Sequence, residues 1–488
     1  MYRQAGLSRR HFIELCAAGA GAALLAACAP KATPAPKEAP AGEAAPAEKK
    51  AEAPKAAEGQ KVLIFVGFGT GTSESQIAEE TALVEECNET LADQGITAEL
   101  MVTPHEEHLA KFSAMLAAGT PPDIVMPIGV GGVAELYDTD AWLDLQPMIE
   151  RDQYDMSDFY GSTVTLHTYS KGTLGLPMAV YPSFMYYNKE LFEKASVDEI
   201  PHAWDDGNWT FDKLVEVGRQ LTLDSSGNSA DQTGFDPTDI VQWGYDESWM
   251  DFAGLSRQFG ATSATGISDD YKTSLFDDPA YASRAQWMSD AIWKHNFVAS
   301  AEMAQEAFSL AGDPFSSGMV AMWHCHTWMM GQTYAELTFD WDLGAMPKGP
   351  TGVVSAQVDA DTFVMAAAGK QQDAAWEVAK WCCSPGILER FALTWGSVPA
   401  RLSGKEIFLQ TLKEKFPGVD EQVLLTAIDY GDVPNHEAWK PQPAKVGDAV
   451  GAAMDRVLLG KERDCAVIMQ ELDKTVQGYL DEYWAQKG

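Results

Sequence analysis

Short apolar runs alternate with amphipathic segments near the start of the folded part of the chain. Residues 61–66 (KVLIFV) form a nearly continuous apolar run, which is typical of a strand buried on both faces. Apolar and polar positions alternate over 96–102, and a third short apolar run follows at 123–126. The intervening segments, 77–91 and 105–118, carry apolar residues at helical spacing. This order predicts a parallel, right-handed α/β sheet.

Local signals at the ends of these elements agree with the pattern. The sequence Ser73-x-x-Gln76 has the spacing of a capping box at a helix start, and Gly-Thr-Pro-Pro at 119–122 stops a helix. Farther along, 361–367 predicts another strand, and apolar positions over 375–382 predict another α/β helix. The last part, 403–488, is mostly helical by pattern.

The N-terminal residues have the character of a targeting segment. A paired arginine, Arg9-Arg10, precedes an apolar run over 12–27 that ends directly before Cys28. This run is shorter than the ~20 apolar residues that a membrane-spanning helix needs, so it predicts a signal peptide over 1–27. The segment resembles a twin-arginine signal joined to a bacterial lipobox. That resemblance implies a lipid on Cys28 that anchors the protein to the outer face of the cell membrane.

A low-complexity stretch separates this signal from the body of the chain. Residues 28–59 consist almost entirely of Ala, Pro, Glu and Lys and lack the large apolar side chains that offset backbone ordering. They predict a disordered linker between the lipid and the folded body. The remaining residues, 60–488, are too many for one ordinary domain and suit two large lobes.

Composition narrows the classes of partner and compartment. A hydrophobic fraction of 46% supports sizeable cores. The formal net charge of −36 argues against nucleic acid or anionic lipid as a partner, since both need a basic protein surface. An acidic surface for solubility accounts for this charge, although it also suits a cationic ligand. An odd number of cysteines in the mature body argues against a disulfide framework; they are Cys87, Cys325, Cys382, Cys383 and Cys465.

Several segments carry a resemblance to a known family. Residues 175–180 (GLPMAV) and 185–192 (MYYNKELF) look like a signature of extracellular solute-binding proteins of family 1, the sugar-binding group. Further segments match the family in the same order and spacing: 119–125, 209–214, 318–322 and 374–401. The match covers nearly the whole body of the chain.

This resemblance implies a periplasmic-binding-protein fold of the α/β class, with two discontinuous lobes joined by a hinge. The first lobe would comprise 60–180 and 351–402, and the second 181–350 and 403–488. It implies an extracytoplasmic component of an ABC importer, not an enzyme, that captures a small solute between the lobes and delivers it to the permease subunits. We expect the solute to be a sugar or an oligosaccharide, and we expect the protein to be a monomer.

Candidate ligand residues follow from the fold and from the family. Ligands of α/β sheets lie beyond the carboxyl ends of the strands, which points to Phe68 and to the loop 127–132. Sugar sites combine aromatic plates with a few carboxylates. The family alignment adds contacts from the hinge and from neighbouring loops, although an isolated tryptophan more often belongs to a lobe core. The predicted set is Phe68, Tyr181, Glu247, Trp249, Trp323, Trp328, Asp361, Trp395 and Arg401.

Motifs typical of enzymes and metal proteins are incomplete in this chain. The run His105-Glu106-Glu107-His108 has the wrong spacing for a zinc protease. His324-Cys325-His326 places two histidines on one face of a strand, but the sequence shows no partner cluster. The stretch Asp224–Asp231 resembles a calcium loop whose twelfth position is Phe235, so it predicts a turn. We therefore expect neither a metal nor a cofactor.

Two alternatives remain open at this stage. One is a binding protein for a cationic or zwitterionic solute, held in a box of tryptophans through cation–π contacts. The other is a glycoside-active enzyme, which would need two carboxylates ~5–10 Å apart with room for a water molecule. Acidic residues that are adjacent in sequence, such as Asp205 and Asp206, do not meet that requirement by themselves.

Overall fold

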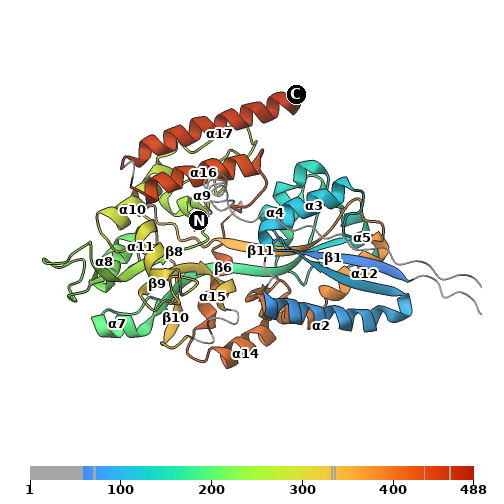
Figure 1. The fold of residues 1–488 in the computed structure, drawn as a ribbon, viewed down its shortest axis with the longest axis horizontal. Coiled ribbons are helices and arrows are strands. Elements are labelled where there is room, and N and C mark those ends of the chain that lie inside the picture. Colours follow the sequence, from blue (N-terminus) through green and yellow to red (C-terminus); the bar gives the residue numbers. More distant parts are fainter. Residues whose placement is uncertain are drawn as a thin grey trace, which may run out of the picture. The chain divides into compact units, whose positions relative to one another are not determined.

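The computed structural model describes residues 59–69, 73–330, 334, 337–432, 435–460 and 463–487. These residues belong to one compact unit that begins at Gly59 (Figure 1). The predicted signal peptide, the lipid attachment site at Cys28 and most of the predicted linker lie outside the described residues. Within the described ranges, no helix combines the length and the apolar character that crossing a membrane requires.

The first strands and helices form the predicted parallel sheet. Strand β1 (Gln60–Val66) lies between β2 (Ile96–Val102) and β3 (Ile124–Gly129), and it runs parallel to both. The connecting helices are α2 (Glu74–Leu91) and α3 (His108–Ala117). Each of these strands and helices lies where the apolar pattern predicts it.

The capping box predicted at the start of α2 is also confirmed. The Ser73 side chain accepts a hydrogen bond from the Gln76 backbone N–H, and the Gln76 side chain accepts one from the Ser73 N–H. These two bonds satisfy backbone donors that the first turn of a helix leaves without a partner. The helix therefore begins where the sequence places its start.

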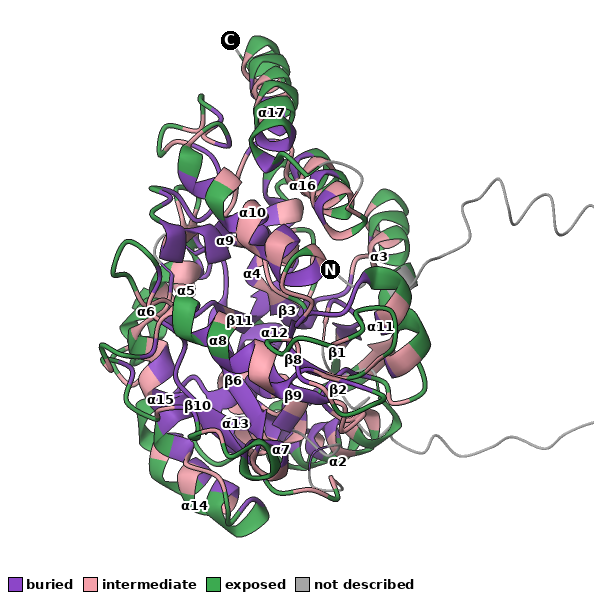
Figure 2. Ribbon diagram, turned by 90° about the vertical axis from the view of Figure 1, so that its left-hand side faces the viewer, coloured by how far each residue is buried: buried purple, intermediate pink, exposed green. Residues whose placement is uncertain are grey.

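The central strand β6 (Leu176–Asn188) is thirteen residues long and buried along its whole length. Its first part pairs with β11 (Val358–Met365) and β12 (Val398–Pro399). Its second part pairs with β9 (Val320–His326) and β10 (Trp341–Gly344). The strand thus continues from one group of strands into the other, and both groups share its buried residues (Figure 2).

The complete sheet follows the order β2-β1-β3-β11-β6-β9-β8-β7. Strand β8 (Ile240–Glu247) runs parallel to β9, and the short β7 (Leu223–Asp224) forms the edge. Helix α8 (Phe211–Leu221) packs against β8, and α10 (Pro279–Trp293) packs against α9 (Phe252–Ser256). We refer to β1, β2, β3, β11, β12 and the first part of β6 as the first strand group, and to β7, β8, β9, β10 and the rest of β6 as the second.

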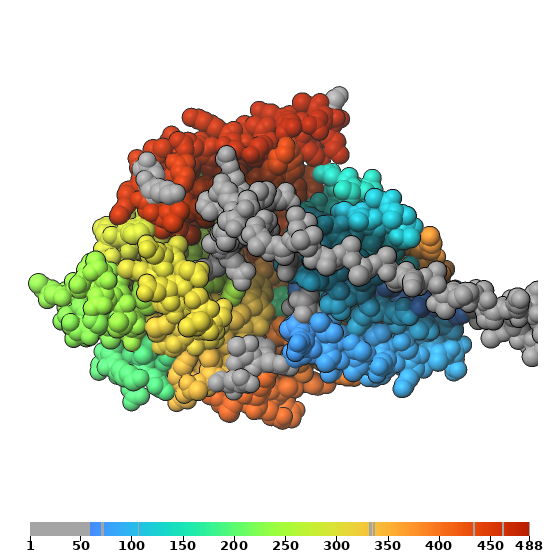
Figure 3. Space-filling model, viewed as in Figure 1, coloured from blue at the N-terminus to red at the C-terminus, as the bar shows by residue number. Residues whose placement is uncertain are grey.

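The C-terminal part is helical, as its pattern predicts. Helices α16 (Pro443–Leu458) and α17 (Cys465–Lys487) pack against each other and against α10. In Figure 3 their red atoms lie beside the yellow atoms of the middle segment. The other helices are α4 (Val130–Glu135), α5 (Gln146–Asp152), α6 (Gly161–Leu166), α7 (Lys189–Ala195), α11 (Ala301–Phe308), α12 (Gln372–Cys382), α13 (Ile387–Trp395), α14 (Lys405–Lys415) and α15 (Glu421–Asp429).

Candidate ligand-binding site

Polar side chains gather where β6 passes from the first strand group to the second. In the sheet register Asp359 of β11 lies opposite Tyr181, and His326 of β9 lies opposite Ser183. Tyr181 and Ser183 are two residues apart on β6, so these opposite pairs place their side chains on the same face of the sheet. Asp361 follows Asp359 on that face for the same reason. The sheet therefore presents two acids, a tyrosine and a histidine together.

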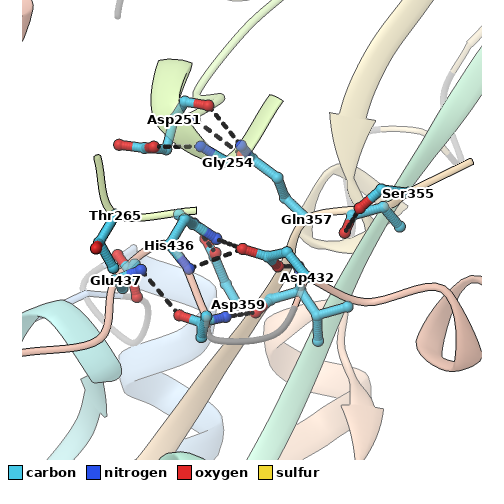
Figure 4. A network of polar contacts seen from close by, with 12 residues as sticks. Asp251, Gly254, Thr265, Ser355, Gln357, Asp359, Asp432, His436 and Glu437 are labelled. Carbon is cyan, nitrogen blue, oxygen red and sulfur yellow. Dashed lines mark hydrogen bonds and ion pairs between the residues drawn. The ribbon is translucent and has the colours of Figure 1, made fainter. Parts of the chain in front are cut away.

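The segment between α15 and α16 covers this polar face. Its Asn435 side chain donates a hydrogen bond to the Val358 carbonyl at 2.7 Å, and its Asp432 accepts one from the Val358 N–H at 3.3 Å. These bonds fix the segment along the start of β11. They place His436 and Glu437 directly above the carboxylate of Asp359 (Figure 4). The site thus combines residues that are far apart in sequence.

His436 lies between two carboxylates. Its Nδ1 atom is 2.8 Å from Oδ2 of Asp432, and its Nε2 atom is 3.0 Å from Oδ1 of Asp359. Burial by itself lowers the pKa of His436, but the charges of Asp432 and Asp359 outweigh it and raise that pKa well above the usual value. At neutral pH the ring is therefore a cation held by two acids.

Two further acids lie beside this pair. Asp361 accepts a hydrogen bond from the Tyr181 hydroxyl at 2.9 Å, and Glu437 accepts one from the Gly131 N–H at 3.1 Å. Burial raises the pKa of Asp361 to about 7 and that of Glu437 to about 7, and the charge of Asp359 adds to both shifts. The cluster therefore holds more carboxylates than cationic partners.

An aromatic surface borders the acids. Trp328, in the short helix Thr327–Met330 that follows β9, is half-buried, and its ring stacks on His326 with a centroid distance of 4.1 Å. The Tyr181 ring lies 5.7 Å from the same tryptophan. Burial lowers the pKa of His326 to about 4, so this histidine is neutral at pH 7. Rings beside carboxylates are the combination that carbohydrate sites use.

The structure brings together three of the residues proposed from the sequence: Tyr181, Trp328 and Asp361. Two others lie at the end of β8. Glu247 forms an ion pair with Arg284, which is only 1% exposed, and accepts a hydrogen bond from Tyr245 at 2.8 Å. Trp249 is 42% exposed and meets Trp323 edge-on.

The remaining four proposed residues are buried among partners of their own. Phe68 packs against Phe65 and Phe112, and Trp323 donates a hydrogen bond to Ser248 at 3.1 Å. Trp395 donates one to Glu80 at 2.8 Å. The Arg401 guanidinium contacts Asp158, Tyr154, the Cys383 carbonyl and the Phe159 ring. These contacts surround each of the four side chains with protein partners, and a ligand contact by any of them stays a prediction.

Sequence reasoning missed Asp359, Asp432, His436 and Glu437. The segment 432–437 has no motif and lies just before a helix, so nothing local marks it. The sequence places His324 and His326 on one face of a strand, and the structure brings the His326 Nε2 atom to 3.7 Å from Oδ1 of Asp359. The stretch from Asp224 is a turn, as predicted, because its carboxylate accepts hydrogen bonds from the N–H groups of Ser226, Asn228 and Asp236.

Comparisons with known proteins agree with this architecture. The family model of the bacterial extracellular solute-binding proteins matches residues 74–387, more than half of the chain. A curated relative from Brucella abortus (strain 2308), named as a binding protein, is 24% identical over 393 residues, which cover 77% of this chain and 84% of the relative.

Solved structures share the fold at lower identity. An ABC substrate-binding protein of Listeria monocytogenes in complex with cycloalternan superposes with a TM-score of 0.69 and 14% identity, covering 86% of this chain and 98% of that one. UgpB of Mycobacterium tuberculosis, in complex with glycerophosphocholine, gives 0.68 and 17%, covering 87% and 99%. The Listeria protein is an ABC substrate-binding protein, and the two-lobed fold with a hinge is the one predicted. The chain belongs to the bacterial extracellular solute-binding proteins.

Proposed function

We propose that this protein captures a small carbohydrate between its two lobes and delivers it to the membrane permease of an ABC importer. The observation that carries the proposal is the position of Trp328 beside Tyr181 and Asp361, where the two strand groups meet. Solved relatives with the same fold include proteins bound to oligosaccharides, such as the Listeria complex with cycloalternan. An extracytoplasmic location follows from the family.

The chemistry of the site suits a hydroxyl-rich ring. The Trp328 ring offers an apolar surface on which the C–H face of a sugar can stack. The Asp361 carboxyl group can accept hydrogen bonds from sugar hydroxyls and, when protonated, donate one to them. Trp328 follows β9 of the second strand group, whereas Asp361 lies on β11 of the first. A solute that contacts both residues favours the closed arrangement of the lobes, because it gains both contacts only there. The permease would recognise this closed form.

Replacing Trp328 by alanine is expected to weaken carbohydrate binding about tenfold. Ring stacking contributes ~0.5–1.5 kcal/mol beyond area burial, and 1.4 kcal/mol corresponds to a factor of ten in affinity. Isothermal titration of the full chain with a panel of mono- and oligosaccharides would measure this change. Trp484→Ala is the matched control, because that half-buried tryptophan donates to the Tyr271 carbonyl, away from the site.

Two results would contradict the proposal. Binding of a sugar that Trp328→Ala leaves unchanged would place the site elsewhere. No binding of any sugar in the panel, together with release of reducing sugar from a polysaccharide, would favour a glycoside-active enzyme.

A cationic or zwitterionic solute is the second candidate. The excess of carboxylates at the site favours it, and the relative from Mycobacterium tuberculosis was solved with glycerophosphocholine. Choline and glycine betaine in the same titration would separate the two candidates. Asp361→Asn keeps the shape and one acceptor oxygen, so it should weaken a sugar only modestly but a cation strongly.

We also propose, from the N-terminal sequence, that Cys28 carries the lipid anchor after removal of residues 1–27. We keep the proposed lobes, 60–180 with 351–402 and 181–350 with 403–488. Their first boundary falls within β6, close to the point where the pairing partners of this strand change, which supports the proposal. Metabolic labelling with a radioactive fatty acid should mark the wild-type chain and not Cys28→Ser. Equal labelling of both would refute the anchor.

A further inference from the structure

His326 is a buried polar side chain without a hydrogen bond. It has no solvent exposure, and neither ring nitrogen finds a hydrogen-bond partner among the described residues. Its Nε2 atom points toward Oδ1 of Asp359 at 3.7 Å, too far for a hydrogen bond. Leaving an imidazole buried in this way costs free energy unless another group completes its environment. The position of His326 therefore indicates an additional ligand near Asp359.

His436 is oriented as metal-binding histidines are. Its Nδ1 atom bonds the carboxylate of Asp432, whose same oxygen also accepts from the His436 backbone N–H at 2.7 Å. This fixes the ring so that Nε2 faces Asp359 and Glu437 (Figure 4). In metal sites a carboxylate commonly holds one ring nitrogen of a histidine while the other nitrogen binds the ion. Asp432 has that position here, and the ion would displace the proton from Nε2, because histidine binds a metal only as the neutral imidazole.

We propose that this chain binds one divalent ion of the zinc class at the junction of the two strand groups, through Asp359, His436 and Glu437, with His326 next to Asp359. One donor atom from each of Asp359, His436 and Glu437 lies within 4.8 Å of the others. Donors that share one zinc ion at ~2.0–2.1 Å lie roughly 3–4 Å apart. The separations of Asp359 Oδ1 from His436 Nε2 (3.0 Å) and His326 Nε2 (3.7 Å) fall in that range.

The donor set points to a transition metal and not to calcium or an organic cation. An imidazole with two carboxylates, and a second imidazole beside them, suits zinc, nickel and copper, whereas calcium and magnesium prefer oxygen ligands alone. The ion would also neutralise the excess of acids, and a neutral, hydroxyl-rich solute would then be favoured over a cationic one.

The ion would also connect parts of the chain that lie far apart in sequence. His326 belongs to β9 of the second strand group, Asp359 belongs to β11 of the first, and His436 and Glu437 belong to the covering segment. A metal bound to Asp359, His436 and Glu437 favours the arrangement in which the first strand group and this segment stay together, beside His326 of the second group. This role is separate from solute capture and does not require the carbohydrate assignment to be right.

Titration of the chelator-treated full chain with zinc chloride tests the proposal. We expect one zinc ion per chain, a higher midpoint of thermal unfolding with zinc, and cobalt absorption bands of a four-coordinate site. Asp359→Asn and Glu437→Gln should each weaken zinc binding at least tenfold. Asp432 contacts the proposed donors only through His436, so Asp432→Asn should weaken zinc binding 10- to 100-fold.

His202→Ala is the control, because His202 also lies between two carboxylates, those of Asp342 and Asp420, but outside the proposed site. Zinc binding that is lost in this control, or kept in Glu437→Gln, would overturn the proposal. A midpoint of thermal unfolding that rises with tetramethylammonium but not with zinc would also overturn the proposal. If Asp359→Asn fails to fold by circular dichroism, Glu437→Gln decides, because its side chain comes from the covering segment and not from the sheet.

Discussion

Replacing Glu247 by glutamine is expected to lower the free energy of unfolding by about 3–5 kcal/mol. The variant removes the charge that faces the guanidinium of Arg284, which is 1% exposed. The Arg284 Nε and Nη1 atoms have no hydrogen-bond partner among the described residues, so Glu247 supplies the main compensation of this buried cation. An unpaired buried charge is costly, whereas replacing both members of such a pair is often close to neutral.

Denaturant unfolding followed by tryptophan fluorescence would measure the loss. Glu482→Gln is the matched control, since the ion pair of Glu482 with Lys445 is half exposed and should contribute little to stability. The double variant Arg284→Met, Glu247→Gln should recover most of the loss. Equal stability of Glu247→Gln and Glu482→Gln would contradict the structural role and return Glu247 to the ligand-binding candidates.

Replacing Glu80 by glutamine is expected to raise the free energy of unfolding by about 3 kcal/mol at pH 7. Glu80 has no solvent exposure, and burial raises its pKa from 4.5 to about 8 despite the hydrogen bond from Trp395. The folded state therefore holds the proton more tightly than the unfolded state does. The contribution of Glu80 to stability is fully present below pH 4.5 and is lost as the pH rises toward 8. Over this range the carboxyl group ionises readily in the unfolded state but not in its buried position in the folded state.

Unfolding curves at pH 5, 6, 7 and 8 would test this expectation. Glutamine keeps the oxygen that accepts from Trp395 and carries no charge, so the difference between variant and wild type should increase with pH. Glu85→Gln on the exposed face of the same helix is the control and should follow the wild type at every pH. A constant difference between Glu80→Gln and wild type would show that Glu80 does not titrate in this range.

The elements that local sequence determines were predicted well. The strand at 61–66 and the capping box at Ser73 depend on residues within a few positions, so the pattern is enough to place them. The parallel order of β2, β1 and β3 also follows from short connections. The passage of β6 through both strand groups was not predicted, because its partners lie far away in sequence.

Tryptophans show why the site was only partly predictable. Trp328 and Trp323 are five residues apart, yet one borders the polar cluster and the other is wholly buried with its indole N–H bonded to Ser248. Both are large rings near the end of the same strand, and only tertiary packing decides which is covered. His436 gave no signal at all, since its role depends on Asp359 and Asp432 approaching it in space.

Strand β6 also sets the order in which the chain can fold. In the described sheet its partners β9, β10, β11 and β12 all follow it in the sequence, the first of them beginning at Val320. During synthesis, more than a hundred further residues must therefore be made before the thirteen residues of β6 have a strand to pair with. An apolar strand with free edges is a template for aggregation. The nascent chain thus exposes this strand until its second half emerges, and fragments that end before Val320 lack the strands of the native pairing.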